Sequence, residues 1–139
     1  MILLRHGQSH FNVHYARTRR DPGIVDPALT EEGRRQAEAA AEVLAGHGIE
    51  RLIVSPYRRT LETAEIVAAR LGVPILIEPL VRERACFACD IGSPRSTLEE
   101  RWPTLDFGDL AETWWPQDEE PESDLLVRCR RFLARMAGD

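Results

Sequence analysis

Short apolar segments alternate with amphipathic helical patterns along the first half of the chain, and this alternation constrains the fold more than any other feature. Residues 2–4, 52–54 and 74–77 are apolar runs with the length of buried strands. Between them, residues 31–44 and 56–71 repeat apolar residues at the i, i+3, i+4, i+7 spacing of a helix with one buried face. Strands joined through helices by short turns pair in parallel with right-handed crossovers. We therefore expect a three-layer α/β/α fold with a mostly parallel sheet.

The first apolar run ends abruptly in a polar loop of sequence Arg-His-Gly-Gln-Ser, residues 5–9. In open α/β sheets, ligands bind at the carboxyl ends of the strands. His6 at such an end, beside Arg5 and with no side chain on Gly7 to block approach, can act as a nucleophile facing an anion. A polar surface turn is the alternative interpretation.

Both predicted helices begin with recognisable signals. Thr30 is a good N-cap, and residues 55–56 (Ser-Pro) predict the N-cap and first residue of the second helix. Arg58 then lies on the first turn of that helix. Helix N-termini attract anions, and an arginine there strengthens the preference. A surface arginine is the alternative for Arg58, and it is what we expect of the adjacent Arg59.

The regular alternation stops after residue 78. Five prolines fall within residues 79–121, which we expect to form an irregular excursion or lid over one end of the sheet. A capping box at residues 96–99 predicts a short helix within it. Its aromatic residues form a small core of their own or line an apolar pocket, and we favour the core. These residues are Trp102, Phe107, Trp114 and Trp115.

The remaining segments have simpler patterns. Residues 13–29 show no period and predict a loop. Residues 117–124 predict a solvated acidic loop, and a final helix is expected from about Ser123 with an apolar face. That face consists of Leu125, Cys129, Phe132, Leu133 and Met136.

Composition limits the partners and the location. The net charge of −5 does not favour nucleic acid. No apolar run approaches the ~20 residues that span a bilayer, and the N-terminus lacks the regions of a signal peptide. We therefore expect a cytoplasmic protein without nucleic-acid or membrane partners. Cys86 and Cys89 have metal-pair spacing but no second pair to complete a zinc site, so we expect no metal and no cofactor.

Three ordered motifs resemble the histidine phosphatase superfamily, also called phosphoglycerate-mutase-like. Residues 5–9 with Asn12 form the first, and residues 29–37 (Leu-Thr-x-x-Gly-x-x-Gln-Ala) the second. The third is Ser-Pro-x-x-Arg-Thr from residue 55, whose arginine is Arg59, with Thr63 and Ala64. Residues 82–84 (Arg-Glu-Arg) resemble the segment that carries the family's acid. The resemblance spans nearly the whole chain, so it implies a single domain of this fold over residues 1–139, closer to the phosphatase branches than to the glycolytic mutases.

The resemblance implies a function and roles for individual residues. His6 would attack the phosphorus of a small phosphorylated substrate and form a phosphohistidine. Arg5, Asn12 and Arg58 would bind the phosphoryl oxygens of the substrate or of inorganic phosphate. Glu83 would protonate the leaving oxygen and then take a proton from water. We expect Glu83 to be shielded, with a raised pKa. The predicted activity is metal-independent phosphomonoester hydrolysis.

One departure from the family pattern concerns a second histidine. The resemblance implies such a residue on a strand that follows a helix like residues 123–137, within the sheet beside the first strand. The chain's histidines are His6, His10, His14 and His47, and none has that context. We expect a fragment of a longer protein in preference to a truncated product that is poorly active or rebuilt by association, for example as a homo-oligomer. Strand edges and apolar surface would then be left uncovered.

The missing phosphate contact affects the expected activity. Losing one transition-state donor lowers turnover by ~10²–10³. A catalytically weak or dead phosphate-binding or regulatory module is therefore an alternative function, and a phosphoglycerate mutase is another.

Overall fold

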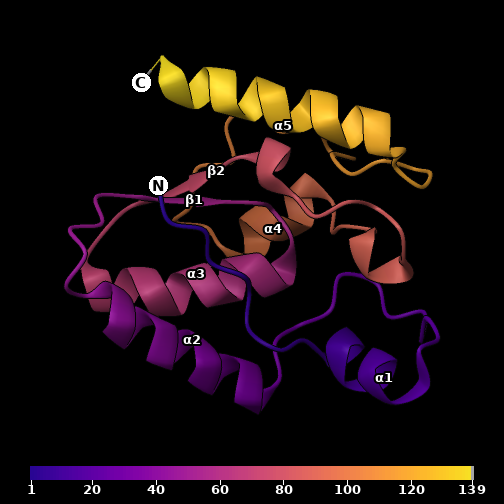
Figure 1. The fold of residues 1–139 in the computed structure, drawn as a ribbon, viewed down its shortest axis with the longest axis horizontal. Coiled ribbons are helices and arrows are strands. Elements are labelled where there is room, and N and C mark those ends of the chain that lie inside the picture. Colours follow the sequence, from indigo (N-terminus) through magenta and orange to yellow (C-terminus); the bar gives the residue numbers. More distant parts are fainter. Residues whose placement is uncertain (139) are drawn as a thin grey trace.

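Two parallel strands, β1 (Leu52–Val54) and β2 (Ile75–Ile77), lie at the centre of the computed structural model, which describes residues 1–138. Leu52 pairs with Ile75, and Val54 pairs with Ile77. Helix α3 (Arg58–Leu71) connects the strands and packs against both of them, and α2 (Glu31–Leu44) packs on α3 (Figure 1). The predicted α/β fold, with both helices and these two strands, is confirmed.

The strand predicted at residues 2–4 is wrong. Ile2, Leu3 and Leu4 have no regular secondary structure and are 51%, 84% and 46% exposed. A strand needs a neighbour to satisfy its backbone and cover its side chains, and the sheet formed within residues 1–138 contains only β1 and β2. The expectation that apolar surface is left uncovered is confirmed at this segment.

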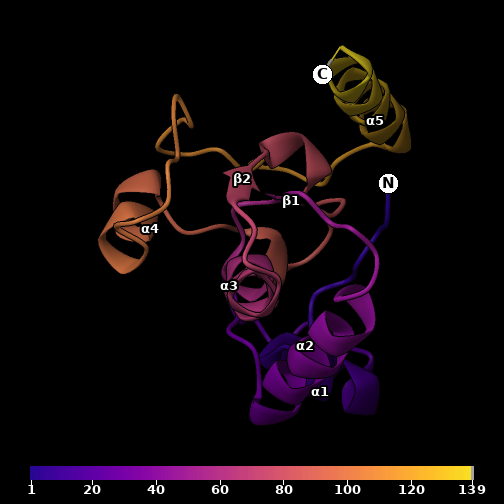
Figure 2. The ribbon, with the colours of Figure 1, turned by 90° about the vertical axis from the view of Figure 1, so that its left-hand side faces the viewer.

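A helix occupies part of the segment predicted as a loop. Residues His10–Thr18 form α1, which lies beyond the start of α2 (Figures 1 and 2). The Asn12 N–H donates to the Ser9 hydroxyl, and the Ser9 N–H donates to the Asn12 side chain, so the two residues form a capping box. Of the α1 residues only Phe11 is buried. Because a single side chain of α1 is buried, its sequence has no periodic apolar pattern from which a helix could be predicted.

Helix α3 begins later than the sequence predicts. Tyr57 is its N-cap, and Ser55 instead contacts the Thr60 hydroxyl. The N–H of Arg58 donates to the Asp26 carboxylate at 2.8 Å. A carboxylate from a distant segment therefore satisfies an N-terminal amide of α3, which local sequence signals could not indicate.

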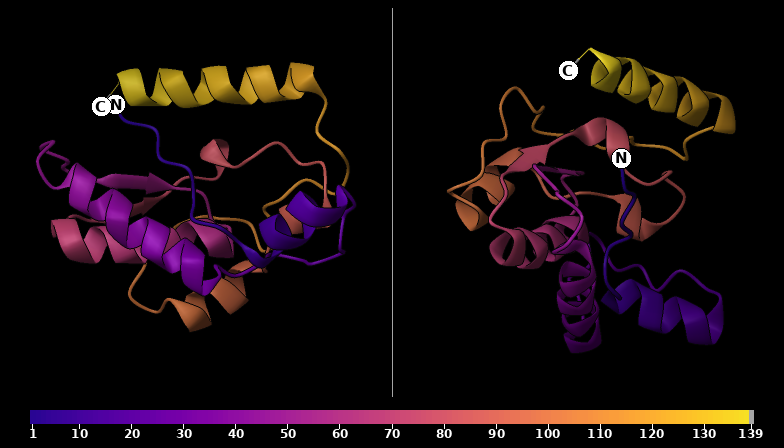
Figure 3. Two further views of the ribbon diagram at one scale, coloured as in Figure 1. Left: turned by 60° about the horizontal axis from the view of Figure 1, so that its bottom comes forward. Right: turned by 60° about the vertical axis from the view of Figure 1, so that its left-hand side comes forward.

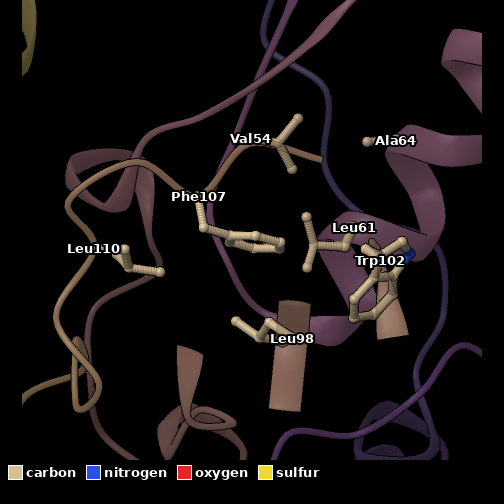
Figure 4. Close-up of a cluster of buried hydrophobic side chains, with 7 residues drawn as sticks. All are labelled: Val54, Leu61, Ala64, Leu98, Trp102, Phe107 and Leu110. Atoms are coloured by element: carbon tan, nitrogen blue, oxygen red, sulfur yellow. The ribbon is translucent and has the colours of Figure 1, made fainter. Parts of the chain in front are cut away.

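The excursion at residues 79–121 contains the 3-10 helices η1 (Pro79–Val81) and η2 (Ala88–Asp90) and the helix α4 (Arg95–Arg101). The short helix is confirmed, but the capping box is wrong, because Pro94 precedes the helix and the Ser96 hydroxyl donates to Glu112. Trp102 and Phe107 are buried, as the core interpretation predicts. The core is shared with β1 and α3, however, and is not the excursion's own (Figure 4). Its residues are Val54, Leu61, Ala64, Leu98, Trp102, Phe107 and Leu110.

Helix α5 (Glu122–Ala137) lies across the strands on the side opposite α3 (Figures 1 and 3). Its predicted apolar face is only partly covered, since Leu133 is 53% exposed and Cys129 is also exposed. Arg128 is the buried residue of this helix, and it binds the buried carboxylate of Glu120. The prediction of a solvated acidic loop at residues 117–124 is therefore wrong at Glu120. No helix in residues 1–138 is both long and apolar enough to cross a membrane.

Candidate active site

The ring of His6 has one nitrogen bound and one nitrogen free. His6 Nδ1 lies 2.6 Å from the carbonyl oxygen of Gly7. A carbonyl oxygen can only accept, so Nδ1 carries the proton and Nε2 carries the lone pair. The side chain is 3% exposed, and Nε2 has no hydrogen-bond partner within residues 1–138. A buried nitrogen that keeps its lone pair unbonded is arranged for nucleophilic attack or for binding a ligand.

Helix α3 and the start of α2 hold the loop that carries His6. The N–H of Gly7 donates to the Thr63 hydroxyl of α3 at 3.1 Å, and the N–H of Thr30 donates to the Gln8 carbonyl at 2.9 Å. A Cβ atom on Gly7 would collide with the carbonyl oxygen of Gly33. The loop therefore lies against the start of α2 with no space for side chains between the two backbones.

Glu83 is the carboxylate beside His6. Its Oε1 lies 3.5 Å from His6 Nε2, and its Oε2 accepts a 2.7 Å hydrogen bond from Arg59 Nη2. The contact with His6, and then the charge of Arg59, hold the pKa of Glu83 at about 2, although burial acts in the opposite direction. The side chain is 43% exposed. The predictions of a shielded position and a raised pKa are therefore both wrong.

Arg59 is buried at the base of the site, so the expectation of a surface arginine is wrong. The residue is 1% exposed. Besides Glu83, its guanidinium donates to the Cys89 carbonyl at 2.7 Å and to Asp90 Oδ1 at 3.1 Å, and it stacks over the Tyr57 ring. Arg59 is the arginine of the third sequence motif, so that motif was the signal that could have identified it.

The other predicted site residues divide into two groups. Arg5 and Asn12 line the same hollows as His6. Arg5 has no ion-pair or hydrogen-bond partner in the part of the chain that the structure describes. Asn12 Oδ1 accepts from Ser9, which leaves the amide NH2 group as a donor. Arg58 is not among the lining residues, because its guanidinium donates to Glu62 at 2.8 Å.

Two hollows meet at His6. The first has a volume of about 430 Å³ and mixes polar and cationic side chains with apolar surface. Besides His6, its lining residues are Arg5, Gln8, Asn12, Tyr15, Ala16, Arg19 and Gln36. The second, of about 390 Å³, contains the Arg59–Glu83 pair and an aromatic wall. That wall is formed by Phe11, Tyr15 and Phe87. No cluster of three or more His, Cys, Asp or Glu side chains within residues 1–138 is arranged to hold a metal ion.

Several curated proteins are similar to this chain over much of its length. The glucosyl-3-phosphoglycerate phosphatase of Mycobacterium tuberculosis is 30% identical over 146 residues, an alignment that covers 99% of this chain and 60% of that protein. A probable phosphoglycerate mutase, GpmB, of Cronobacter sakazakii is 40% identical over 83 residues, covering 60% of this chain and 37% of the relative. The chain thus spans about 60% or less of the length of these relatives.

Solved structures show the same relationship. The vanadate complex of a mycobacterial glucosyl-3-phosphoglycerate phosphatase superposes with a TM-score of 0.66 at 30% identity, covering 97% of this chain and 63% of that one. YhfR of Bacillus stearothermophilus gives a TM-score of 0.65 at 26% identity, with 96% and 65% covered. Residues 1–139 match the sequence profile of the histidine phosphatase superfamily, branch 1. The chain therefore belongs to the histidine phosphatase superfamily and has a phosphoglycerate-mutase-like α/β fold.

Proposed function

We propose that this protein hydrolyses phosphomonoesters through a phosphohistidine formed on His6. The observation that carries the proposal is the buried Nε2 of His6, which has a lone pair and no hydrogen-bond partner within residues 1–138. The Gly7 carbonyl holds the opposite ring nitrogen, so the ring is already in the tautomer and orientation for attack. Relatives named as phosphatases of glucosyl-3-phosphoglycerate support the reaction class.

In the first step, His6 Nε2 bonds to phosphorus and the bond from phosphorus to the leaving oxygen breaks. The guanidinium groups of Arg59 and Arg5 and the amide of Asn12 would stabilise the negative charge on the transferred oxygens. Of the two arginines at the start of α3, we assign the main phosphate contact to Arg59 and a lesser role to Arg58, because Arg59 lines the second hollow with His6, whereas Arg58 lines neither of the two hollows and donates to Glu62. These groups supply the charge that the reaction needs, so the scheme uses no metal.

Glu83 would give the leaving oxygen its proton. In the unliganded protein this carboxyl is ionised at neutral pH, because the contacts with His6 and Arg59 keep its pKa below the usual range. A phosphate group bound at Arg59 competes for the guanidinium and adds negative charge beside Glu83, and both effects raise the pKa of Glu83. The monoanionic form of the substrate can bring the proton. In the second step, the Glu83 carboxylate takes a proton from the water that attacks the phosphohistidine.

Covalent labelling tests the proposal. Incubation with a ³²P-labelled phosphomonoester should give acid-labile, base-stable label and release inorganic phosphate. His6→Asn should abolish both, whereas His10→Asn, at an exposed position on α1, should leave both unchanged. Absence of label and turnover in a protein that still binds phosphate would overturn the proposal in favour of a phosphate-binding module.

A phosphoglycerate mutase is the second candidate, favoured by the similarity to probable mutases over 83 residues. Incubation with 3-phosphoglycerate separates the two activities. Release of inorganic phosphate supports hydrolysis, and formation of 2-phosphoglycerate supports the mutase.

A further inference from the structure

We propose that the substrate's leaving group is aromatic, and that Tyr15 and Phe87 form the surface on which it binds. The proposal rests on the proposed function and adds to it a class of substrate. The rings of Phe11, Tyr15 and Phe87 form a continuous wall with centroid separations of 5.2–5.6 Å. Phe11 is buried, while Tyr15 is half-buried and Phe87 is 40% exposed.

The position of Glu83 determines which hollow receives the leaving group. His6 lines both hollows, whereas Glu83 lines only the second. A proton donor must come within hydrogen-bond distance of the oxygen that it protonates. The leaving oxygen, and the group attached to it, therefore lie in the hollow that contains the aromatic wall. Arg59, the main phosphate contact, also lines only the second hollow, so the phosphoryl group lies between His6 and Glu83, where the two hollows meet.

The charged side chains of the second hollow disfavour a leaving group that carries a negative charge. Arg59 is bound to Glu83 and Asp90, and Arg84 donates to the Glu120 carbonyl and pairs with Glu119. Arg5 is the remaining arginine of this lining and is required by the phosphoryl group. With Arg5 and Arg59 assigned to the phosphoryl group, a carboxylate on the leaving group would meet Arg84, which is already paired, and the carboxylates of Glu83 and Asp90. A flat apolar ring would meet aromatic faces, with which it packs favourably.

Alkyl phosphates test the preference without a bias from leaving-group acidity. Benzyl phosphate, methyl phosphate and 3-phosphoglycerate all release alcohols that need a proton, and we expect benzyl phosphate to have the highest kcat/KM. Phe87→Ala and Tyr15→Ala should each lower kcat/KM for benzyl phosphate by about three- to ten-fold and leave methyl phosphate nearly unchanged. Tyr15→Phe, which keeps the ring, should retain the preference. Higher activity on 3-phosphoglycerate, or equal losses on both alkyl substrates, would overturn the proposal.

Binding of benzylphosphonate, which cannot be hydrolysed, separates this proposal from the proposed function. It should bind more tightly than methylphosphonate, and Phe87→Ala should remove the difference. If no substrate is hydrolysed but this difference is found, the aromatic surface is supported and the proposed function fails. If methyl phosphate is hydrolysed but the phosphonates bind equally, the aromatic surface is wrong and the proposed function stands. Urea unfolding of each variant checks that the fold is retained.

Discussion

Arg58 and Arg59 are adjacent in the sequence, but their guanidinium groups bind carboxylates in different parts of the molecule. Arg58 Nε donates to Glu62 on the following turn of α3, and Arg59 Nη2 donates to Glu83 in the site. Successive side chains on a helix point in directions about 100° apart, so only one of two neighbours can face the loop that carries His6. In the structure, Arg59 is the one that lines the hollow beside His6.

Substitution of each arginine by lysine tests this difference. Arg59→Lys keeps the positive charge but loses the planar guanidinium with its several hydrogen-bond donors. The substitution should lower kcat/KM by about 10²–10³-fold. Arg58→Lys breaks a partly exposed pair within one helix, and should change kcat/KM by no more than a few-fold. Steady-state hydrolysis of p-nitrophenyl phosphate measures both. A larger loss in the Arg58 variant would contradict the assignment.

Glu83→Gln should slow phosphoryl transfer from a substrate to an extent that depends on how much its leaving group needs a proton. Loss of a general acid costs about 10²–10⁴-fold for an alkyl phosphate. Because p-nitrophenolate leaves as a stable anion, p-nitrophenyl phosphate should lose much less in single-turnover formation of the phosphohistidine. Rapid-quench measurements of this step compare the two substrates. Equal losses would show that Glu83 acts by holding Arg59 and not as the proton donor.

The contact between the His6 loop and α2 should not tolerate a methyl group. A Cβ on Gly33 would collide with the Gln8 carbonyl oxygen, which belongs to the backbone and cannot rotate away. Gly33→Ala should destabilise the fold by about 1–3 kcal/mol, the usual cost of overpacking, although alanine is ordinarily the better helix former. Gly46→Ala is the matched control, since no atom lies within 4 Å of its added Cβ. The urea concentration at the midpoint of unfolding should fall for Gly33→Ala and stay unchanged for Gly46→Ala.

The buried Glu120 carboxylate should make stability depend on pH. Hydrogen bonds from Arg128 and then Arg82 lower the pKa of Glu120 from 4.5 to about 2. Because the folded-state pKa is lowered, this stabilisation is complete above pH 4.5 and is lost as the pH falls towards 2. Glu120→Gln should cost about 3 kcal/mol at pH 7, since it leaves two arginines without their charged partner.

The cost of Glu120→Gln should shrink when unfolding is measured at pH 3. Glu119→Gln is the control, because its pair with Arg84 is exposed and worth about 0.5 kcal/mol or less. The free energies of unfolding of wild type and Glu120→Gln should differ less at pH 3 than at pH 7. An equal difference at the two pH values would contradict the proposed ionisation of Glu120.

Local patterns in the sequence predicted the elements whose stability depends on near neighbours in the chain. The apolar periods of α2 and α3, the Thr30 cap and the two short strands are all found in the structure. The ordered motifs also identified the family and the His6 loop. These features were readable because helix periodicity, capping and motif spacing act over a few residues.

Only the tertiary structure decided the features that depend on partners far along the chain. Residues 2–4 have a strand-forming sequence and form no strand, because no strand within residues 1–138 lies beside them. Three properties of the site and its surroundings depend on groups that folding brings together. They are the burial of Arg59, the protonation state of Glu83 and the burial of Glu120. Hydrogen bonding, burial and the field of neighbouring charges are properties of position in space, so the spacing of residues along the chain cannot determine them.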